Sequence, residues 1–332
     1  MHLDLDLTPI RLFLHFSQKL LLASLFNAAL AGTAACSEAM RIADNVYAII
    51  GTPGEVTAAN GGRVANRGFI VGTDSVTVID TGTTYRQGKE MLQAIAGVTS
   101  KPVRLVILTH AVQEFIFGSA AFDELGVPIL AHSKTAELMK ARCDHCLANL
   151  RPVLGTELLG TRLVLPSRTI DATTLIDQGG RKLELLHFGW ASTPGDVAVF
   201  DRTSGVLFAG GLLSVDRVPE IRDADFDGWL RALSRLRELR FGLLVPGHGN
   251  ISGGHAAIEQ TETYLRALDG KVKTLYGSGR SLLESVDSGD LQEYAQLPQY
   301  DPLHRRNVLH RYLQLEIEAF GGDPRSTALP QQ

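Results

Sequence analysis

The stretch "LVILTHAVQEFIFG", Leu105 to Gly118, decides the fold of this chain. Its run of branched apolar residues predicts a buried strand that ends at Thr109-His110, and a helix start follows near Gln113. A buried strand therefore delivers a histidine to its carboxyl end. Three nearby side chains decide which chemistry that histidine can take part in: Val112, Glu114 and Phe115.

Strands and helices alternate on both sides of this stretch. From Met40, short strands with Gly and Asp turn signals occur at "VYAIIG", "RGFIVG" and "SVTVIDTG", and "RQGKEMLQAIAGV" is helical. The second half repeats the scheme with the hairpin "TLIDQGGRKLELLHFG", turning at Gly179-Gly180, and the amphipathic helix "DFDGWLRALSRLREL". This α/β order predicts two sheets with helices on both outer faces.

The composition is that of a globular chain with a large core. Of 332 residues, 45% are hydrophobic and 20% are charged. The net charge is -4, and both signs are mixed along the chain. No basic face indicates a nucleic-acid partner, and we expect none.

The first residues, 1–39, have the features of a signal peptide. Arg11 and Lys19 precede the apolar run "LLLASLFNAALAGTAA", and small residues follow it. The run is too short for a stable membrane span. Cleavage after Ala31 or after Ala39 fits the small-residue pattern, so we expect a periplasmic or secreted protein.

Two alternatives at this end stay open. Cys36 indicates a lipoprotein, although Thr33 is a poor match for the usual residue three positions earlier. Asp4 and Asp6 are unusual in a signal peptide, and a true start at Met40 would give a cytoplasmic protein.

The pair Cys143 and Cys146, in "CDHC", lies on a segment with helical apolar spacing. In an exported protein the simplest expectation is a local disulfide, and in the cytosol the pair would indicate redox or metal chemistry. A zinc site would need further ligands, and only His145 is near.

The C-terminal part is predicted to be helical. We expect the main domain over residues 40–265, a helical extension over 266–322 and a disordered tail over 323–332. The extension could be a lid, a dimerisation element or helices packed on the domain.

Several turns resemble the site loops of the metallo-β-lactamase superfamily. The resemblance runs in order from "NRGFIVG" at Asn66 through "VIDTG", "LTHAVQEFIFGSAAF", "ASTPGDVAVF" and "VLFAGGLL" to "LVPGHG". Within the superfamily, "CLANLRPVLGTELLGTRLVLPSRTI" and "HRRNVLHRYLQLEIEAF" are similar to quinoprotein relay system zinc metallohydrolases. The resemblance implies the αββα sandwich of two mixed sheets between outer helices, with a C-terminal helical extension.

The resemblance also implies positions for the ligands of two zinc ions. His110 and His248 match their expected residue type, and Asp80 stands where the superfamily has a second-shell carboxylate. The remaining positions depart from the pattern: Val112 and Phe115 replace histidines, Glu114 replaces an aspartate, Ser192 replaces a histidine, and Gly211 replaces the bridging aspartate.

These departures remove most of the electron-pair donors that zinc needs. Two-metal activation of water is therefore not expected. One zinc or iron ion held by His110, Glu114 and His248 remains a hypothesis, with Asp80 as an outer partner. The alternative is that these three residues make ordinary hydrogen bonds and helix-end contacts, and that no cofactor binds.

Other polar and aromatic residues have structural interpretations. Ser192 has no base placed beside it by sequence, and Asp196 fits either a turn cap or a contact with a ligand. We expect a core histidine at His187, a capping histidine at His132, and core or pocket-wall roles for Trp190 and Trp229.

The sequence thus predicts an exported metallo-β-lactamase-fold protein with depleted zinc ligands, a non-catalytic or accessory relative of quinoprotein-associated metallohydrolases. Its expected partner is a small molecule or a periplasmic protein. The alternatives are a single-metal hydrolase of an ester, thioester or lactam-type bond, and a chain with no present activity.

Overall fold

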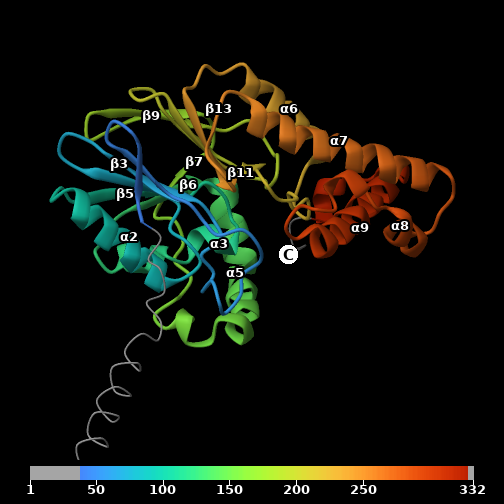
Figure 1. Ribbon diagram of the computed structural model, residues 1–332, viewed down its shortest axis with the longest axis horizontal. Coiled ribbons are helices and arrows are strands. Elements are labelled where there is room, and N and C mark those ends of the chain that lie inside the picture. The colour runs from blue at the N-terminus through green and yellow to red at the C-terminus, as the bar shows by residue number, and fades with distance from the viewer. Residues whose placement is uncertain (1–37, 328–332) are drawn as a thin grey trace, which may run out of the picture. The chain divides into compact units, whose positions relative to one another are not determined.

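Two β-sheets form the centre of the computed structural model, which describes residues 38–327 (Figure 1). The first sheet has seven strands in chain order, antiparallel from β1 to β4 and parallel from β4 to β7. They are β1 (Met40–Ala43), β2 (Val46–Ile49), β3 (Arg67–Val71), β4 (Val76–Ile79), β5 (Val103–Ile107), β6 (Ile129–His132) and β7 (Arg168–Ile170).

The second sheet has six strands in the order β13-β12-β11-β10-β9-β8. Strands β11 and β12 are parallel, and their other neighbours pair antiparallel. The strands are β8 (Thr174–Gln178), β9 (Arg181–Leu186), β10 (Ala198–Asp201), β11 (Val206–Ser214), β12 (Leu243–His248) and β13 (Ser252–Gly253).

Helices cover the outer face of each sheet (Figure 1). Those beside the first sheet are α2 (Tyr85–Val98), α3 (Gln113–Ile116), α4 (Ser119–Asp123) and α5 (Ser133–Leu154), which continues into the 3-10 turn η2 (Gly155–Leu158). Those beside the second sheet are α6 (Phe226–Arg237) and α7 (Ala256–Gly277). The predicted αββα sandwich is confirmed.

Three apolar layers hold this sandwich together. The middle layer joins the inner faces of the sheets, for example Ile70 and Ile107 of the first with Leu185 and Val199 of the second. The outer layers pack each sheet against its helices. Strands β3, β4 and most of β5 are buried on both faces, which explains their continuous apolar sequence.

The predicted hairpin at Gly179-Gly180 joins β8 and β9, with Gln178 opposite Arg181. Both glycines have positive φ, 60° and 71°. A two-residue turn with positive φ at both positions matches the twist of the flanking strands, so glycine is the favoured residue there.

The helix predicted after Gln113 is divided into α3 and α4. The division falls at Gly118, whose backbone lies against the loop after β4. A Cβ on Gly118 would be 2.1 Å from the carbonyl oxygen of Thr81. Thr81 in turn hydrogen-bonds the carbonyl oxygen of Phe115 through its backbone N–H and its hydroxyl, at 2.7 and 2.9 Å. This contact fixes α3 under the end of β5.

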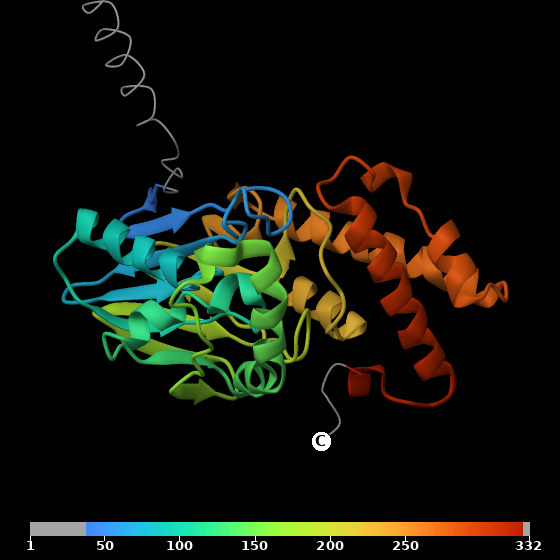
Figure 2. The same cartoon turned by 90° about the horizontal axis from the view of Figure 1, so that it is seen from below.

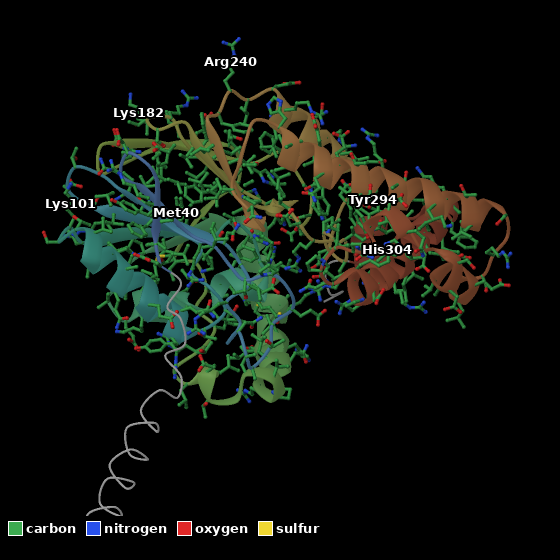
Figure 3. The ribbon with its side chains drawn as sticks, viewed as in Figure 1. Met40, Lys101, Lys182, Arg240, Tyr294 and His304 are labelled. Atoms are coloured by element: carbon green, nitrogen blue, oxygen red, sulfur yellow. The ribbon has the colours of Figure 1, made fainter. Side chains whose placement is uncertain are left out.

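The boundary predicted between residues 265 and 266 falls inside α7. Three further helical elements follow: α8 (Leu282–Ser288), the 3-10 turn η3 (Gln292–Tyr294) and α9 (Tyr300–Ala319). Figure 2 shows α9 lying beside α7, and Figure 3 labels His304 and Tyr294 in this region. The sequence analysis did not predict α8.

Helix α9 is packed on the body through buried polar contacts. Asn307 donates to the carbonyl oxygen of Pro219 at 2.7 Å and accepts from the N–H of Ile221 at 3.2 Å. Gln314 donates to the carbonyl oxygen of Ala224 at 3.1 Å. The helix therefore fixes the loop between β11 and α6, and the expectation of helices packed on the domain describes it well.

At the chain ends, residues 1–37, with the cleavage site at Ala31 and with Cys36, lie outside the described residues. The predicted disordered tail begins instead with a 3-10 turn, η4 (Pro324–Thr327), in which Asp323 accepts a hydrogen bond from the N–H of Arg325 at 2.9 Å. Residues 328–332 are again outside the described part. Within residues 38–327, no helix is both long and apolar enough to cross a bilayer.

Candidate functional site

His110 follows the carboxyl end of β5 in the first sheet, and a path of hydrogen bonds orients its ring. Asp80, at the end of β4 with φ 56°, accepts from the N–H and from the hydroxyl of Thr109, at 2.9 and 2.8 Å. The oxygen of that hydroxyl lies 2.8 Å from His110 Nδ1. Because the hydroxyl proton goes to Asp80, Nδ1 carries the imidazole proton, and the Nε2 lone pair is directed away from Thr109.

Burial shifts the pKa values of the two titratable side chains in this hydrogen-bond path, Asp80 and His110. It raises the pKa of Asp80 to about 7, against the opposing effect of the two hydrogen bonds from Thr109. Burial and the neighbouring His248 lower the pKa of His110 to about 3. His110 is therefore a neutral imidazole at physiological pH. Asp80 reaches His110 through Thr109, a residue that the sequence analysis did not single out.

Gly211 of β11 lies directly against the free edge of the His110 ring. A Cβ at this position would be 2.6 Å from His110 Cδ2, 2.8 Å from Nε2 and 2.9 Å from Ser192 Oγ. Such contacts are too short for any side chain. The position that the resemblance gives to a bridging aspartate is thus closed to a carboxylate in this arrangement.

Ser192 directs its hydroxyl proton to Asp196, at 2.7 Å from Oδ1. Asp196 also accepts from the N–H of Thr193 at 2.6 Å and from its hydroxyl at 3.1 Å. Burial raises the pKa of Asp196 to about 7, although these hydrogen bonds oppose the shift. Asp196 therefore caps the turn of "STPGD", as one of its two interpretations predicted.

Phe115 separates the two histidines of the site. Its side chain is fully buried, and its ring centroid lies 4.3 Å from that of His110 and 5.2 Å from that of His248. The planes of Phe115 and His248 are nearly perpendicular, at 85°. An apolar ring thus occupies the position that the resemblance gives to a histidine ligand.

Glu114 and His248 contact each other on the far side of Phe115, and burial together with Arg217 lowers the pKa of His248. His248 Nε2 lies 3.3 Å from Glu114 Oε2. Burial alone would raise the pKa of Glu114, but its contact with His248 and the nearby Arg217 bring it to about 2. The carboxylate is therefore charged and already has a partner.

These residues do not fit the zinc centre that the resemblance implies. Val112, Phe115 and Gly211 have no donor atom, and the hydroxyl of Ser192 is engaged with Asp196. Among the described residues, no three His, Cys, Asp or Glu side chains come together as a metal-binding group.

The site residues line two adjoining cavities. The inner one, of about 50 Å³, is bordered by His110, Glu114, Ser192, Gly211 and His248. The outer one, of about 300 Å³, extends between α5 and the start of α9. Val112, Glu114, Arg217, Glu220 and Arg222 line both cavities.

The sequence analysis missed Arg217, Glu220 and Arg222. They lie in the loop between β11 and α6, outside every motif of the resemblance. The sequence feature that could have indicated these residues is "SVDRVPEIRD", a charged stretch that directly follows a buried strand ending at the site. Recognising it also requires α9, which holds this loop against the cavity.

The other residues singled out by sequence have structural roles. His132 Nδ1 accepts from the N–H of Lys134 at 3.1 Å and caps α5, as predicted. His187 Nδ1 lies 2.9 Å from the carbonyl oxygen of Asp196. Trp190 and Trp229 donate to the carbonyl oxygens of Asp223 and Leu212 at 2.7 and 3.0 Å, and Trp229 borders the inner cavity.

Cys143 and Cys146 are free thiols one turn apart on α5, where a local disulfide was expected. Cys143 is buried, and its thiol donates a hydrogen bond that lowers the pKa of Cys146 to about 7; Arg222 contributes to the same shift. An α-helix holds side chains at this spacing farther apart than the β-carbons of a relaxed disulfide.

Known proteins match the same part of the chain. The sequence profile of the metallo-beta-lactamase superfamily matches residues 60–248. The type 2 metallo-beta-lactamases of Bacillus sp. (strain 170) and Bacillus cereus are each 24% identical, over 198 and 199 residues, which cover 58% of this chain and 70% of each relative.

Solved structures share the fold. A metallo-beta-lactamase from Pontibacter korlensis aligns with a TM-score of 0.55 at 23% identity, covering 69% of this chain and 98% of that one. The DIM-1 metallo-beta-lactamase aligns with a TM-score of 0.52 at 18% identity, covering 69% and 96%. With both sheets, the loop order and the profile in agreement, this chain belongs to the metallo-β-lactamase superfamily.

Proposed function

We propose that this chain is an exported protein that keeps the metallo-β-lactamase fold without two-zinc chemistry. It acts as a non-catalytic binding or accessory protein related to the quinoprotein-associated metallohydrolases. The observation that carries the proposal is the buried ring of Phe115, which lies between His110 and His248. A hydrolase of this superfamily needs metal-bound water in that space.

The cavities support a binding role. An inner cavity of about 50 Å³ and an outer one of about 300 Å³ remain open where the loops of the fold converge. A ligand there would meet charged side chains at the mouth and a neutral imidazole at the base. Small-molecule sites combine such a concave surface with a few polar groups.

The proposed location is the periplasm or the exterior of the cell, and the proposed partner is a small molecule or a periplasmic protein. The support is the signal-like run in residues 1–39. The mass of the mature protein from its native host tests this part. A mass that matches a mature chain starting at residue 32 or 40 supports export. A mass that includes Met1, or recovery of the protein from the cytosol, contradicts it.

A single-metal hydrolase is the second candidate. It is favoured by one observation: His110, Glu114 and His248 border the same inner cavity. One zinc or iron ion on these residues would supply an activated water for an ester, thioester or lactam-type bond. The relatives named metallo-beta-lactamase type 2 point to the same bond class.

Metal content separates the two candidates. We would purify the protein without chelator and measure zinc and iron by mass spectrometry, for the wild type, His110→Ala, His248→Ala and a Cys146→Ser control. Less than about a tenth of an equivalent supports the binding protein, because even a weakened three-ligand site retains some metal. Near-stoichiometric metal that both histidine variants lose, and the control keeps, supports the hydrolase.

A further inference from the structure

Arg217 lies where three cavities meet. It borders the inner and outer cavities of the site and a third cavity, of about 370 Å³, beside Gly51 and Asn250. The two residues before it are held in place: the N–H of Val215 donates to the carbonyl oxygen of His248 at 3.0 Å, and the side chain of Asp216, at φ 55°, accepts from the amide of Asn250 at 2.8 Å. The loop thus directs Arg217 toward the site.

The guanidinium of Arg217 has no protein acceptor among residues 38–327. Its Nε is buried without a hydrogen-bond partner, and no carboxylate of this part of the chain lies within 4.0 Å of it. Glu114 is the charged neighbour whose pKa Arg217 helps to lower, and burial and Arg217 together lower the pKa of His248. A buried N–H without an acceptor is unfavourable, so its presence points to an acceptor that is not part of the protein.

Arg222 borders the same two site cavities with weak contacts of its own. Its nearest carboxylates, Asp223 and Glu220, lie 3.5 and 3.8 Å away, beyond a strong hydrogen bond. Asp223 has a closer partner in Arg142. Two guanidinium groups therefore line both cavities together with two carboxylates, Glu114, which contacts His248, and Glu220, which lies 3.8 Å from Arg222.

We propose that Arg217 and Arg222 bind an oxyanion, a carboxylate or a phosphate group, at the junction of the inner and outer cavities. This inference rests on the proposed binding function and names the chemical class of the ligand. About 50 Å³ holds a few atoms of an anionic head group, and about 300 Å³ outside it holds the body of a small organic molecule. Guanidinium groups bind both anions through paired hydrogen bonds.

His110 adds a second contact for such a ligand. Its unprotonated Nε2 borders the inner cavity beside Gly211 and can accept a hydrogen bond from a hydroxyl or amide of the ligand. Helix α9 contributes as a positioning element, because Asn307 fixes the backbone at Pro219 and Ile221, between the two arginines.

The test is calorimetric titration of the full chain, stripped of metal with EDTA and dialysed, with sodium succinate and with inorganic phosphate at constant ionic strength. Neutral succinamide is the ligand control. We expect saturable binding of at least one anion and no binding of succinamide. The anion that binds more tightly shows whether the ligand carries a carboxylate or a phosphate group. Saturation by neither anion, or equal binding of succinamide, overturns the proposal.

Variants locate the site. Arg217→Gln and Arg222→Gln should each weaken the binding at least about tenfold, which removing a guanidinium contact predicts. Arg202→Gln, an exposed arginine paired with Glu184, is the matched control and should bind like the wild type. Wild-type affinity in Arg217→Gln or Arg222→Gln overturns the proposal. Arg222 is 52% exposed, so its variant is expected to fold.

Stability provides an independent readout. Arg217→Met removes the orphaned N–H and should melt at the wild-type temperature or above while losing the anion. A strongly lowered melting temperature would assign Arg217 to the structure and overturn its binding role. Metal content, measured on the same preparations, tests the underlying binding function separately: stoichiometric metal contradicts that function but leaves the anion titration of the stripped protein interpretable.

Discussion

The rings of Phe115 and His110 pack against each other with centroids 4.3 Å apart, and the two residues are only 0% and 3% exposed. This pair turns the end of β5 into part of the core. The contribution of this contact to stability can be measured by substituting Phe115 in the metal-free protein.

Phe115→Ala should lower the free energy of unfolding by about 3–5 kcal/mol, the usual cost of deleting a fully buried phenyl ring. Urea denaturation of the metal-free protein measures it. The matched control is Phe320→Ala, because Phe320 is 90% exposed and should change stability by less than about 0.5 kcal/mol. Equal effects of the two variants would contradict the buried packing of Phe115.

Thr109→Val should disturb the orientation of His110. The valine keeps the shape of threonine but removes the hydroxyl that joins Asp80 Oδ2 to His110 Nδ1. We expect a loss of about 1–3 kcal/mol in stability, because a buried acceptor is left without its donor. Nitrogen NMR should show the Nδ1–H tautomer in the wild type and in Thr109→Ser, but a mixture in Thr109→Val. An unchanged tautomer in Thr109→Val would contradict the proposed hydrogen-bond path from Asp80 through Thr109 to His110.

The stability of the protein should depend on pH through Asp196. Burial raises its folded-state pKa to about 7, so the folded state binds the proton more tightly than the unfolded state, where the value is near 3.8. The resulting stability is fully present below pH 3.8 and is lost as the pH rises through 7. Asp196→Asn should therefore gain stability relative to the wild type across this window, by up to about 1.4 kcal/mol per pH unit.

Urea midpoints from pH 5 to pH 8 measure this difference. Asp80, also raised to about 7, is present in both proteins, so its contribution cancels in the comparison. A pH-independent offset between variant and wild type would show that Asp196 is ionised throughout.

Asn307→Leu should loosen the loop that carries Arg217 and Arg222. Asn307 is fully buried and bonds Pro219, Ile221 and the hydroxyl of Tyr264. Removing these bonds leaves several buried backbone groups unpaired, each costing about 1–3 kcal/mol. Hydrogen exchange should accelerate in residues 216–224, while Arg305→Ala on the exposed side of α9 should leave it unchanged. Unaltered exchange in Asn307→Leu would contradict the anchoring role of α9.

Cys146 should react with iodoacetamide much faster than Cys143 at neutral pH. The hydrogen bond from Cys143 and the nearby Arg222 lower the pKa of Cys146 to about 7, whereas Cys143 is buried and its pKa is raised. The reaction rate should rise with pH around a midpoint near 7. That midpoint should move to higher pH in Cys143→Ser, because the serine donates a different hydrogen bond to Cys146. Equal labelling of both thiols would contradict this asymmetry.

The sequence predicted the sandwich because its signals are local and repeated. The apolar runs at β3, β4 and β5, the turn at Gly179-Gly180 and the periodicity of α6 each specify one element, and the order of elements then limits the topology. Strands β1 and β7 and helix α8 were missed because their sequences are short, partly exposed and without strong periodicity.

The sequence analysis singled out site residues only where they lie in the loop motifs. His110, Glu114 and His248 line the inner cavity, and Asp80 contacts Thr109 beside His110. Arg217 and Arg222 were not predicted, since their placement depends on contacts with Asn307 and Gln314, about ninety positions away in sequence. Helical periodicity also could not reveal that Gly211 touches His110, because that contact joins strands of different sheets.

The closed space beside Gly211 restricts which substitutions position 211 accepts. An aspartate there would collide with the imidazole of His110, which itself packs against Phe115. A larger side chain at position 211 therefore requires the histidine ring to move, and the buried phenyl ring beside it opposes that movement. The two positions are coupled, so a double substitution at 115 and 211 should differ in its effect from the sum of the two single substitutions.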